Sequence, residues 1–156
     1  MSDATGLLAD KERAGVIRTV LSNNPGMAED TAARIVNEAI KFTATCAKFP
    51  EARLRPSRVV DEGWHALILH TRVYKDLCDG LGRFVHHTPQ PPDPSRHNSG
   101  ELTRTQEMIV KAGFPVDDAL WLAPGDESIP VAATCEHSEP GGEGTCTGDC
   151  SNTGPN

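Results

Sequence analysis

The sequence predicts an all-α fold: a small helical bundle of about four helices around a central apolar helix, followed by a disordered acidic tail. Apolar residues recur at three- and four-residue steps through most of the first 122 residues, which is the spacing of helices that face a core. Residues 123–156 are instead rich in Gly, Pro, Ser, Thr and acids and lack aromatic side chains. We therefore expect a helical domain over residues 1–122 and a disordered tail containing Gly and Cys over residues 123–156.

Two amphipathic helices are expected in the first 50 residues. From Asp10 to Leu21 an apolar stripe with helical spacing is present, and the turn formers of residues 22–26 end it. The stripe consists of Ala14, Ile17 and Leu21, with Val16 and Val20 beside it. The second helix, about residues 29–47, has a narrow apolar seam with alternating steps of four and three: Ala28, Ala32, Ile35, Ala39, Phe42 and Cys46.

The central helix is expected to run without a break from Ser57 to about Leu81. Ser57 is a favourable N-cap, and Asp61 in the first turn complements the helix dipole. Apolar residues cover more than half of the circumference, so neighbours on two sides are expected. Gly80 and Gly82 are expected to end the helix as C-cap glycines, and residues 84–89 leave it in an extended form because Pro89 disfavours helix before it.

A shorter helix is expected beyond a surface loop. Residues 90–99 contain three prolines and few apolar side chains, which is typical of a loop. The helix then spans about residues 101–112, with four apolar side chains available for burial: Leu102, Met108, Ile109 and Val110. A last apolar anchor follows in Phe114, Leu120 and Trp121.

Charge and composition exclude several classes of partner. The net charge is −7, and six of the 22 acidic residues but none of the 15 basic ones lie in residues 123–156. No basic stripe is left for a nucleic-acid backbone, so we expect no nucleic-acid partner. No apolar run of about 18 residues and no signal-peptide pattern is present, so we expect no membrane contact and a cytoplasmic location. The five cysteines are then not expected to form a disulfide framework.

A family resemblance rests on the middle of the chain. The pattern comprises three segments: Val60-Asp61-Glu62-x-Trp64-His65, Leu69-x-Thr71-x-x-Tyr74-x-x-x-Cys78 and Gly82-x-Phe84-x-His86-His87-x-Pro89. It resembles the bacterial branch of the glycine-rich domain-containing protein-like family over roughly residues 10–122. The resemblance implies a helical fold and a cluster of polar residues on it, and it implies no particular reaction.

Asp61 and His65 are the first candidate metal ligands. They lie four residues apart on the expected helix, so their side chains are about 6 Å apart and can face one ion. A carboxylate and an imidazole suit Zn²⁺ or Fe²⁺, and either ion could take a third ligand such as His87. The alternative is a structural His65 that is hydrogen-bonded to Asp61 or to a backbone carbonyl.

Chain length restricts which histidines can meet. His65 lies about 21 Å along a continuous helix from Asp79, and the extended chain from Asp79 to His86 or His87 reaches about 24–27 Å. A site of Asp61 and His65 with one of the paired histidines therefore requires that segment to run straight back. His70 is nearer, so His70 with His86 and His87 is a competing site. Since adjacent residues of extended chain point in opposite directions, one histidine of the pair should face the core.

The tail contains a second set of possible ligands. Cys135, His137, Cys146 and Cys150 could collect Zn²⁺ or Cu⁺, although their spacing matches no standard zinc module. The alternative is an unstructured tail without specific metal binding.

Two classes of function follow, and the sequence identifies no reaction and no catalytic residue. The first is a helical binding or interaction domain that docks an unknown protein or small ligand through the proline-rich loop or the tail. The second is a metal-binding protein or metal-dependent enzyme that uses Asp61, His65 and the His86-His87 pair with Zn or Fe. The base rate favours the first class, and the position of the histidines supports the second.

Overall fold

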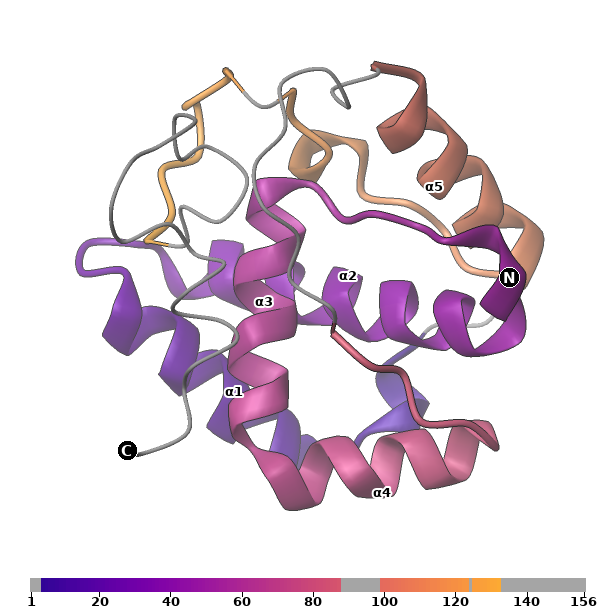
Figure 1. Cartoon of the computed structure of the whole chain (residues 1–156). Helices are drawn as coiled ribbons and strands as arrows, with labels where there is room; N and C mark the ends of the chain where they lie inside the picture. Colours follow the sequence, from indigo (N-terminus) through magenta and orange to yellow (C-terminus); the bar gives the residue numbers. More distant parts are fainter. Residues whose placement is uncertain (1–3, 88–98, 124, 133–156) are drawn as a thin grey trace, which may run out of the picture.

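A computed structural model describes residues 4–87, 99–123 and 125–132, which form helices and connecting segments without strands (Figure 1). The all-α prediction is confirmed. The proline-rich loop and, from residue 133 on, the predicted tail lie outside the described residues. The elements in chain order are η1 (Ala4–Leu7), α1 (Asp10–Asn23), α2 (Glu29–Lys48), η2 (Pro50–Ala52), α3 (Arg58–Leu69), α4 (Thr71–Leu81), α5 (Ser99–Ala112) and η4 (Asp118–Leu120).

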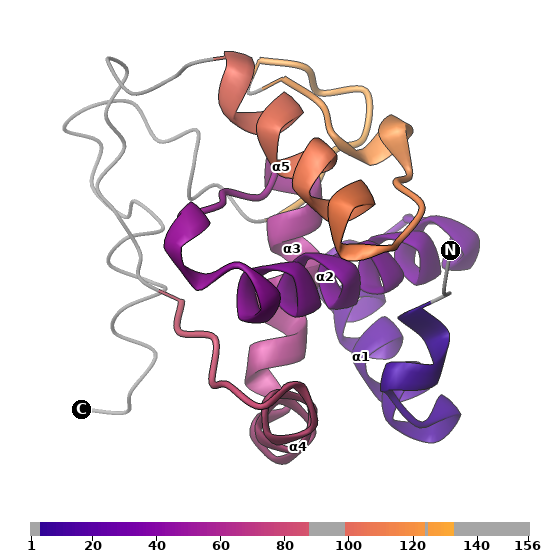
Figure 2. The same ribbon diagram turned by 90° about the vertical axis from the view of Figure 1, so that its right-hand side faces the viewer.

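Two helices share the centre of the bundle. α3 packs against α1, α2 and α4, as expected of an apolar helix with neighbours on two sides. α2 contacts the other four α-helices and both η1 and η2, and Figure 2 shows it between α5 on one side and α1 and α4 on the other. The expected narrow seam on α2 is wrong, because its polar residues are buried too: Glu38, Lys41, Thr43 and Thr45.

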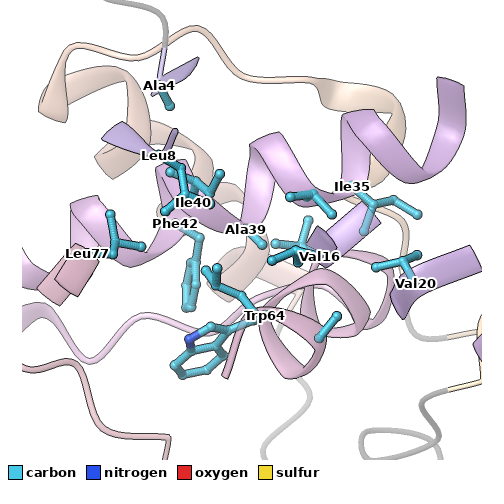
Figure 3. Packing of buried hydrophobic residues seen from close by; sticks show 14 of the residues in the cluster. Ala4, Leu8, Val16, Val20, Ile35, Ala39, Ile40, Phe42, Trp64 and Leu77 are labelled. Atoms are coloured by element: carbon cyan, nitrogen blue, oxygen red, sulfur yellow. The ribbon is translucent and has the colours of Figure 1, made fainter. Parts of the chain in front are cut away.

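Gly63 on α3 lies directly against α2. A Cβ atom at Gly63 would lie 2.8 Å from the carbonyl oxygen of Ile35 and 3.1 Å from the Cβ atom of Ala39. Glycine therefore allows the two helix backbones to approach each other here. The apolar cluster around this contact includes the labelled side chains of Ile35, Ala39, Phe42 and Trp64 in Figure 3.

The helix expected over residues 57–81 is two helices. α3 ends at Leu69, α4 begins at Thr71, and His70 between them has a non-helical backbone with φ −83° and ψ 71°. The Nε2 atom of His70 lies 2.7 Å from the hydroxyl oxygen of Thr19 on α1, so a contact between helices holds the break. Figure 1 shows α4 turning away from the axis of α3 at this point.

Two positions expected to be buried are exposed. α1 buries Val16 and Val20, whereas Ala14 faces solvent, so the stripe that meets the core lies beside the predicted one. On α5, Ile109 is fully buried but Val110 is 46% exposed. In both helices a neighbouring apolar residue occupies the core position instead.

A polar network binds the segment after α5 to α2. The buried Glu38 carboxylate accepts hydrogen bonds from Trp121 Nε1 at 2.9 Å and from the Asp117 backbone N–H at 3.2 Å. Lys41 Nζ lies 2.9 Å from the other oxygen of Glu38 and donates to the carbonyl oxygen of Pro115 at 2.7 Å. These contacts explain why the polar face of α2 is buried.

The last described residues return to the turn after α1. The backbone N–H of Ala132 donates to Asn24 Oδ1 at 2.7 Å, and Asn24 Nδ2 donates to the buried carboxylate of Glu62 at 2.8 Å. The described chain thus contacts the bundle as far as residue 132. None of the helices in the described ranges combines the length and apolarity that a bilayer crossing requires.

Candidate metal centre

Asp61 and His65 are positioned by the beginning of α3. Ser57 is the N-cap: its hydroxyl oxygen accepts a hydrogen bond from the backbone N–H of Val60 at 3.1 Å and donates to the carbonyl oxygen of Leu120 at 2.7 Å. The cap fixes where the helix begins, so it also fixes which face Asp61 presents. His65 follows one turn later, and its Nε2 atom lies 3.4 Å from Asp61 Oδ1.

His87 reaches the same place from the other direction. Gly82 ends α4 in the left-handed conformation with φ 79°, and residues 83–87 then run back toward α3 (Figure 1). Along this extended segment Val85 is buried, His86 is exposed and His87 is half-buried. The expected alternation places one histidine of the pair toward the protein, and that residue is His87.

Three ligand atoms converge at the meeting point. The Nε2 atoms of His65 and His87 are 2.6 Å apart, well inside the separation of about 5 Å that two ligands of one ion require. Asp61 Oδ1 lies 3.4 Å from the first nitrogen and 3.8 Å from the second. A circle through three atoms with these separations has a radius of about 2 Å, which matches the Zn–N and Zn–O distances of about 2.0–2.2 Å.

The two imidazole rings meet edge to edge. Their planes agree within 6° and their centroids are 4.7 Å apart. A face-to-face stack would keep the atoms about 3.5 Å apart, so nitrogens at 2.6 Å can belong only to edges that point at each other. Without an ion this is the geometry of an N–H···N hydrogen bond. Two tetrahedral ligands of Zn²⁺ lie about 3.4 Å apart, so binding would separate the nitrogens by less than about 1 Å.

Burial keeps both imidazoles in the neutral form that binds metals. Desolvation, followed by the charge of His87, lowers the pKa of His65 to about 4, and desolvation lowers the pKa of His87. The nearby carboxylate of Asp61 favours protonation and so opposes both shifts. At neutral pH both rings are therefore uncharged, and one Nε2 atom already offers a lone pair. The Nε2 atom that donates in the N–H···N contact would have to pass its proton to its own Nδ1 atom, or release it, before binding an ion.

Aromatic side chains hold the ring of His87. The indole of Trp64 is parallel to it within 11° at a centroid distance of 4.5 Å, and the ring of Phe42 meets the indole in a T-shaped contact with centroids 5.1 Å apart. Trp64 Nε1 donates to the hydroxyl of Tyr74 at 3.2 Å, and that hydroxyl donates to the carbonyl oxygen of Val85. The sequence did not predict that Tyr74 supports the site, although Tyr74 lies ten residues after Trp64, a spacing that puts both side chains on one face of a continuous helix.

Comparison with known proteins gives a family and no activity. The model of the UCP032817-like family matches residues 11–108, which include all three converging ligands. The chain belongs to this family. No curated protein and no solved structure matches the chain.

In this UCP032817-like chain the other candidate ligands lie elsewhere. The ring of His86 packs against the exposed Phe84 at a centroid distance of 4.7 Å and points away from His65. His70 is hydrogen-bonded to Thr19 at the break between α3 and α4. Within the described ranges, Asp61, His65 and His87 are the group of three possible ligands with atoms within 4.8 Å of one another. Cys135, His137, Cys146 and Cys150 lie outside those ranges.

Proposed function

We propose that this chain binds a divalent transition metal ion through Asp61 Oδ1, His65 Nε2 and His87 Nε2. The observation that supports it best is a common point about 2 Å from all three atoms, at the distance where zinc is bound. Ligands from two separate segments converge there, and both imidazoles are neutral at physiological pH.

The ligand set favours Zn²⁺ or Fe²⁺. Two imidazoles and one carboxylate form a site with borderline donors that suits either ion. Three protein ligands leave at least one coordination position open, as in catalytic rather than structural zinc sites. The side chains of His65 and His87 are 19% and 18% exposed, so the site lies near the protein surface. A metal-handling role or a metal-dependent reaction is consistent with this site.

The remaining expectations are part of the same proposal. A cytoplasmic location, the absence of a nucleic-acid partner and kinship with glycine-rich domain-containing proteins are supported by composition and by the quoted sequence pattern. A domain boundary near residue 122 is also proposed from composition. The segment 125–132 nevertheless contacts the body, since Arg58 donates to the carbonyl oxygen of Asp126 at 3.1 Å.

Metal analysis of untagged protein tests the proposal. Titration with Co²⁺, followed by its visible absorption, should show one bound ion per chain, and Zn²⁺ should displace it. The variants His65→Ala and Asp61→Asn should each weaken binding by at least about 100-fold, because removing a ligand costs more than the 10–100-fold typical of its supporting residues.

His86→Gln is the matched control, since His86 is the exposed sequence neighbour of His87. It should bind Co²⁺ as the parent chain does. Equal losses in His86→Gln and His65→Ala, or no binding by the parent chain, would contradict the proposal.

A further inference from the structure

In the described part of the chain, His87 lacks the hydrogen bond at its second ring nitrogen that ordinarily orients a metal-binding histidine. Such a residue usually donates its second ring nitrogen to a carboxylate, a carbonyl or water, and this bond fixes the direction of the ring. The Nδ1 atom of His87 is buried, and it has no hydrogen-bond partner in the described part of the chain. Within the described residues, contacts other than a bond at Nδ1 aim its Nε2 atom at Asp61 and His65.

The contacts around His87 supply an alternative. The hydroxyl of Tyr74 donates to the carbonyl oxygen of Val85, two residues before His87, and so anchors the backbone of the returning segment. The same hydroxyl accepts the indole N–H of Trp64 at 3.2 Å. The indole in turn lies flat against the His87 ring at a centroid distance of 4.5 Å. The Tyr74 hydroxyl is thus hydrogen-bonded both to the backbone two residues before His87 and to the indole that stacks on the His87 ring.

We infer that Tyr74 is a positioning residue for the metal centre: through Val85 and Trp64 it places the His87 imidazole where an ordinary site would use a hydrogen bond at Nδ1. The inference rests on the proposed function, since positioning affects metal affinity only if the three ligands bind an ion. Tyr74 itself lies on α4, contacts α3 and the returning segment, and donates no atom to the ion.

Geometry makes the hydroxyl group the decisive part of Tyr74. Tyr74 is 3% exposed, and the edge of its ring packs on Phe84 at 5.5 Å, so the ring alone fills space in the bundle. Burial raises the pKa of the Tyr74 phenol, so the hydroxyl keeps its proton and remains a donor to Val85 at any pH of interest. Tyr74→Phe removes both hydrogen bonds and leaves the packing ring in place.

The test is the Co²⁺ affinity of Tyr74→Phe. It should be lower than that of the parent chain by about 10- to 100-fold, the range found for groups that support a ligand, and the Co²⁺ absorption bands should shift because the ligand geometry changes. Ile109→Val is the matched control: it removes one methyl group from a fully buried residue on α5 and leaves the three ligands untouched. Its affinity should stay within about twofold of the parent value.

A second variant separates the effect of the hydrogen bond between Trp64 and Tyr74 from that of the hydrogen bond between Tyr74 and Val85. Trp64→Phe keeps an aromatic ring against His87 but has no N–H for Tyr74, so its loss of affinity should be smaller than that of Tyr74→Phe. Unchanged affinity and unchanged bands in folded Tyr74→Phe would overturn the inference while leaving the proposed metal site intact.

A measurement on the metal-free protein distinguishes failure of the proposed metal site from failure of the positioning role of Tyr74. The ring current of Trp64 should shift the imidazole proton resonances of His87 in the metal-free protein, and Tyr74→Phe should reduce this shift. If the parent chain bound no Co²⁺, the proposed function would fail, and a reduced shift would still support positioning of His87 by Tyr74. An unaltered shift in Tyr74→Phe would overturn the positioning role in either case.

Discussion

His86 and His87 are chemically identical neighbours with opposite surroundings. His86 lies against Phe84 on the surface, whereas His87 lies between Trp64 and His65. The difference arises from the period of two residues in an extended chain, which directs adjacent side chains to opposite faces. Only one of the pair can therefore be a ligand for an ion held on α3.

Buried neutral histidine should make the metal-free protein sensitive to mild acid. The unfolded chain protonates His65 near pH 6.5, but the folded chain does so only near its pKa of about 4. Between these values the unfolded state binds more protons, so stability falls as pH falls, at up to about 1.4 kcal/mol per pH unit for one histidine. Urea denaturation at pH 7.0, 6.0 and 5.0 should show this loss.

Two variants identify the source of that pH dependence. His65→Ala should reduce the dependence of unfolding free energy on pH between 6.5 and 5, because one of the two buried histidines with a lowered pKa is gone and His87 remains. His86→Gln should leave the slope as it is, since that residue is exposed. A slope that survives undiminished in His65→Ala would assign the acid sensitivity to other groups.

At the scale of helices, the approach of α2 to α3 depends on the missing side chain of Gly63. Alanine is ordinarily favoured over glycine within a helix by about 1 kcal/mol. Here its Cβ atom would lie 2.8 Å from the carbonyl oxygen of Ile35, so the helices must move apart. Gly63→Ala should therefore destabilise the protein, by about 1–3 kcal/mol, as measured by thermal or urea unfolding.

Gly80→Ala is the control for that substitution. Gly80 lies inside α4 with no atom near the position of a Cβ, so alanine there should be neutral or stabilising. A higher free energy of unfolding for Gly63→Ala than for the parent chain would contradict this prediction. It would mean that α2 and α3 can move apart at little cost.

The existence of the helices follows from local pattern, but two features of them do not. Nothing at Leu69-His70-Thr71 is a strong helix breaker, and the interruption there depends on the contact of His70 with Thr19, which is 51 residues away in the chain. Likewise, the burial of Glu38 depends on Trp121, 83 residues later. The period of apolar residues indicates which face of a single helix is apolar. It does not show whether a distant segment will cover the polar face of that helix.

For the whole molecule, the network around Glu38 connects the C-terminal segment to the bundle. Trp121→Phe would leave Glu38 without one donor while keeping an aromatic ring near Phe42, whose centroid is 6.5 Å from that of Trp121. Loss of a hydrogen bond to a buried carboxylate costs about 1.5–3 kcal/mol, so the free energy of unfolding of the variant, measured by urea denaturation, should be lower by that amount.

Lys48→Met provides the comparison, because Lys48 also reaches across to the carbonyl oxygen of Ala112 but is exposed. Its effect should stay within about 0.5 kcal/mol. Similar losses in both variants would show that Glu38 contributes no more than a surface contact does.

The candidate site was partly predictable from the sequence. The spacing of Asp61 and His65 on a helix indicated that they face one point, and the extended form of residues 84–87 indicated that one histidine of the pair could join them. The competing possibility with His70 remained open because the sequence does not show the break at His70, which redirects α4 and ties that histidine to α1. The aromatic support of His87 likewise appears only when α3, α4 and the returning segment are assembled.

The separation of 22 residues between His65 and His87 has a consequence for the rates of folding and unfolding. Asp61 and His65 lie one turn apart on α3, whereas His87 meets them through α4 and the reversal at Gly82, so we expect the contact with His87 to form late in folding. A contact made late in folding is absent from the transition state, so strengthening it slows unfolding and leaves the folding rate unchanged. Stopped-flow measurements should therefore show that Co²⁺ alters the unfolding arm of the chevron alone, and the ion would extend the lifetime of the native chain against proteolysis.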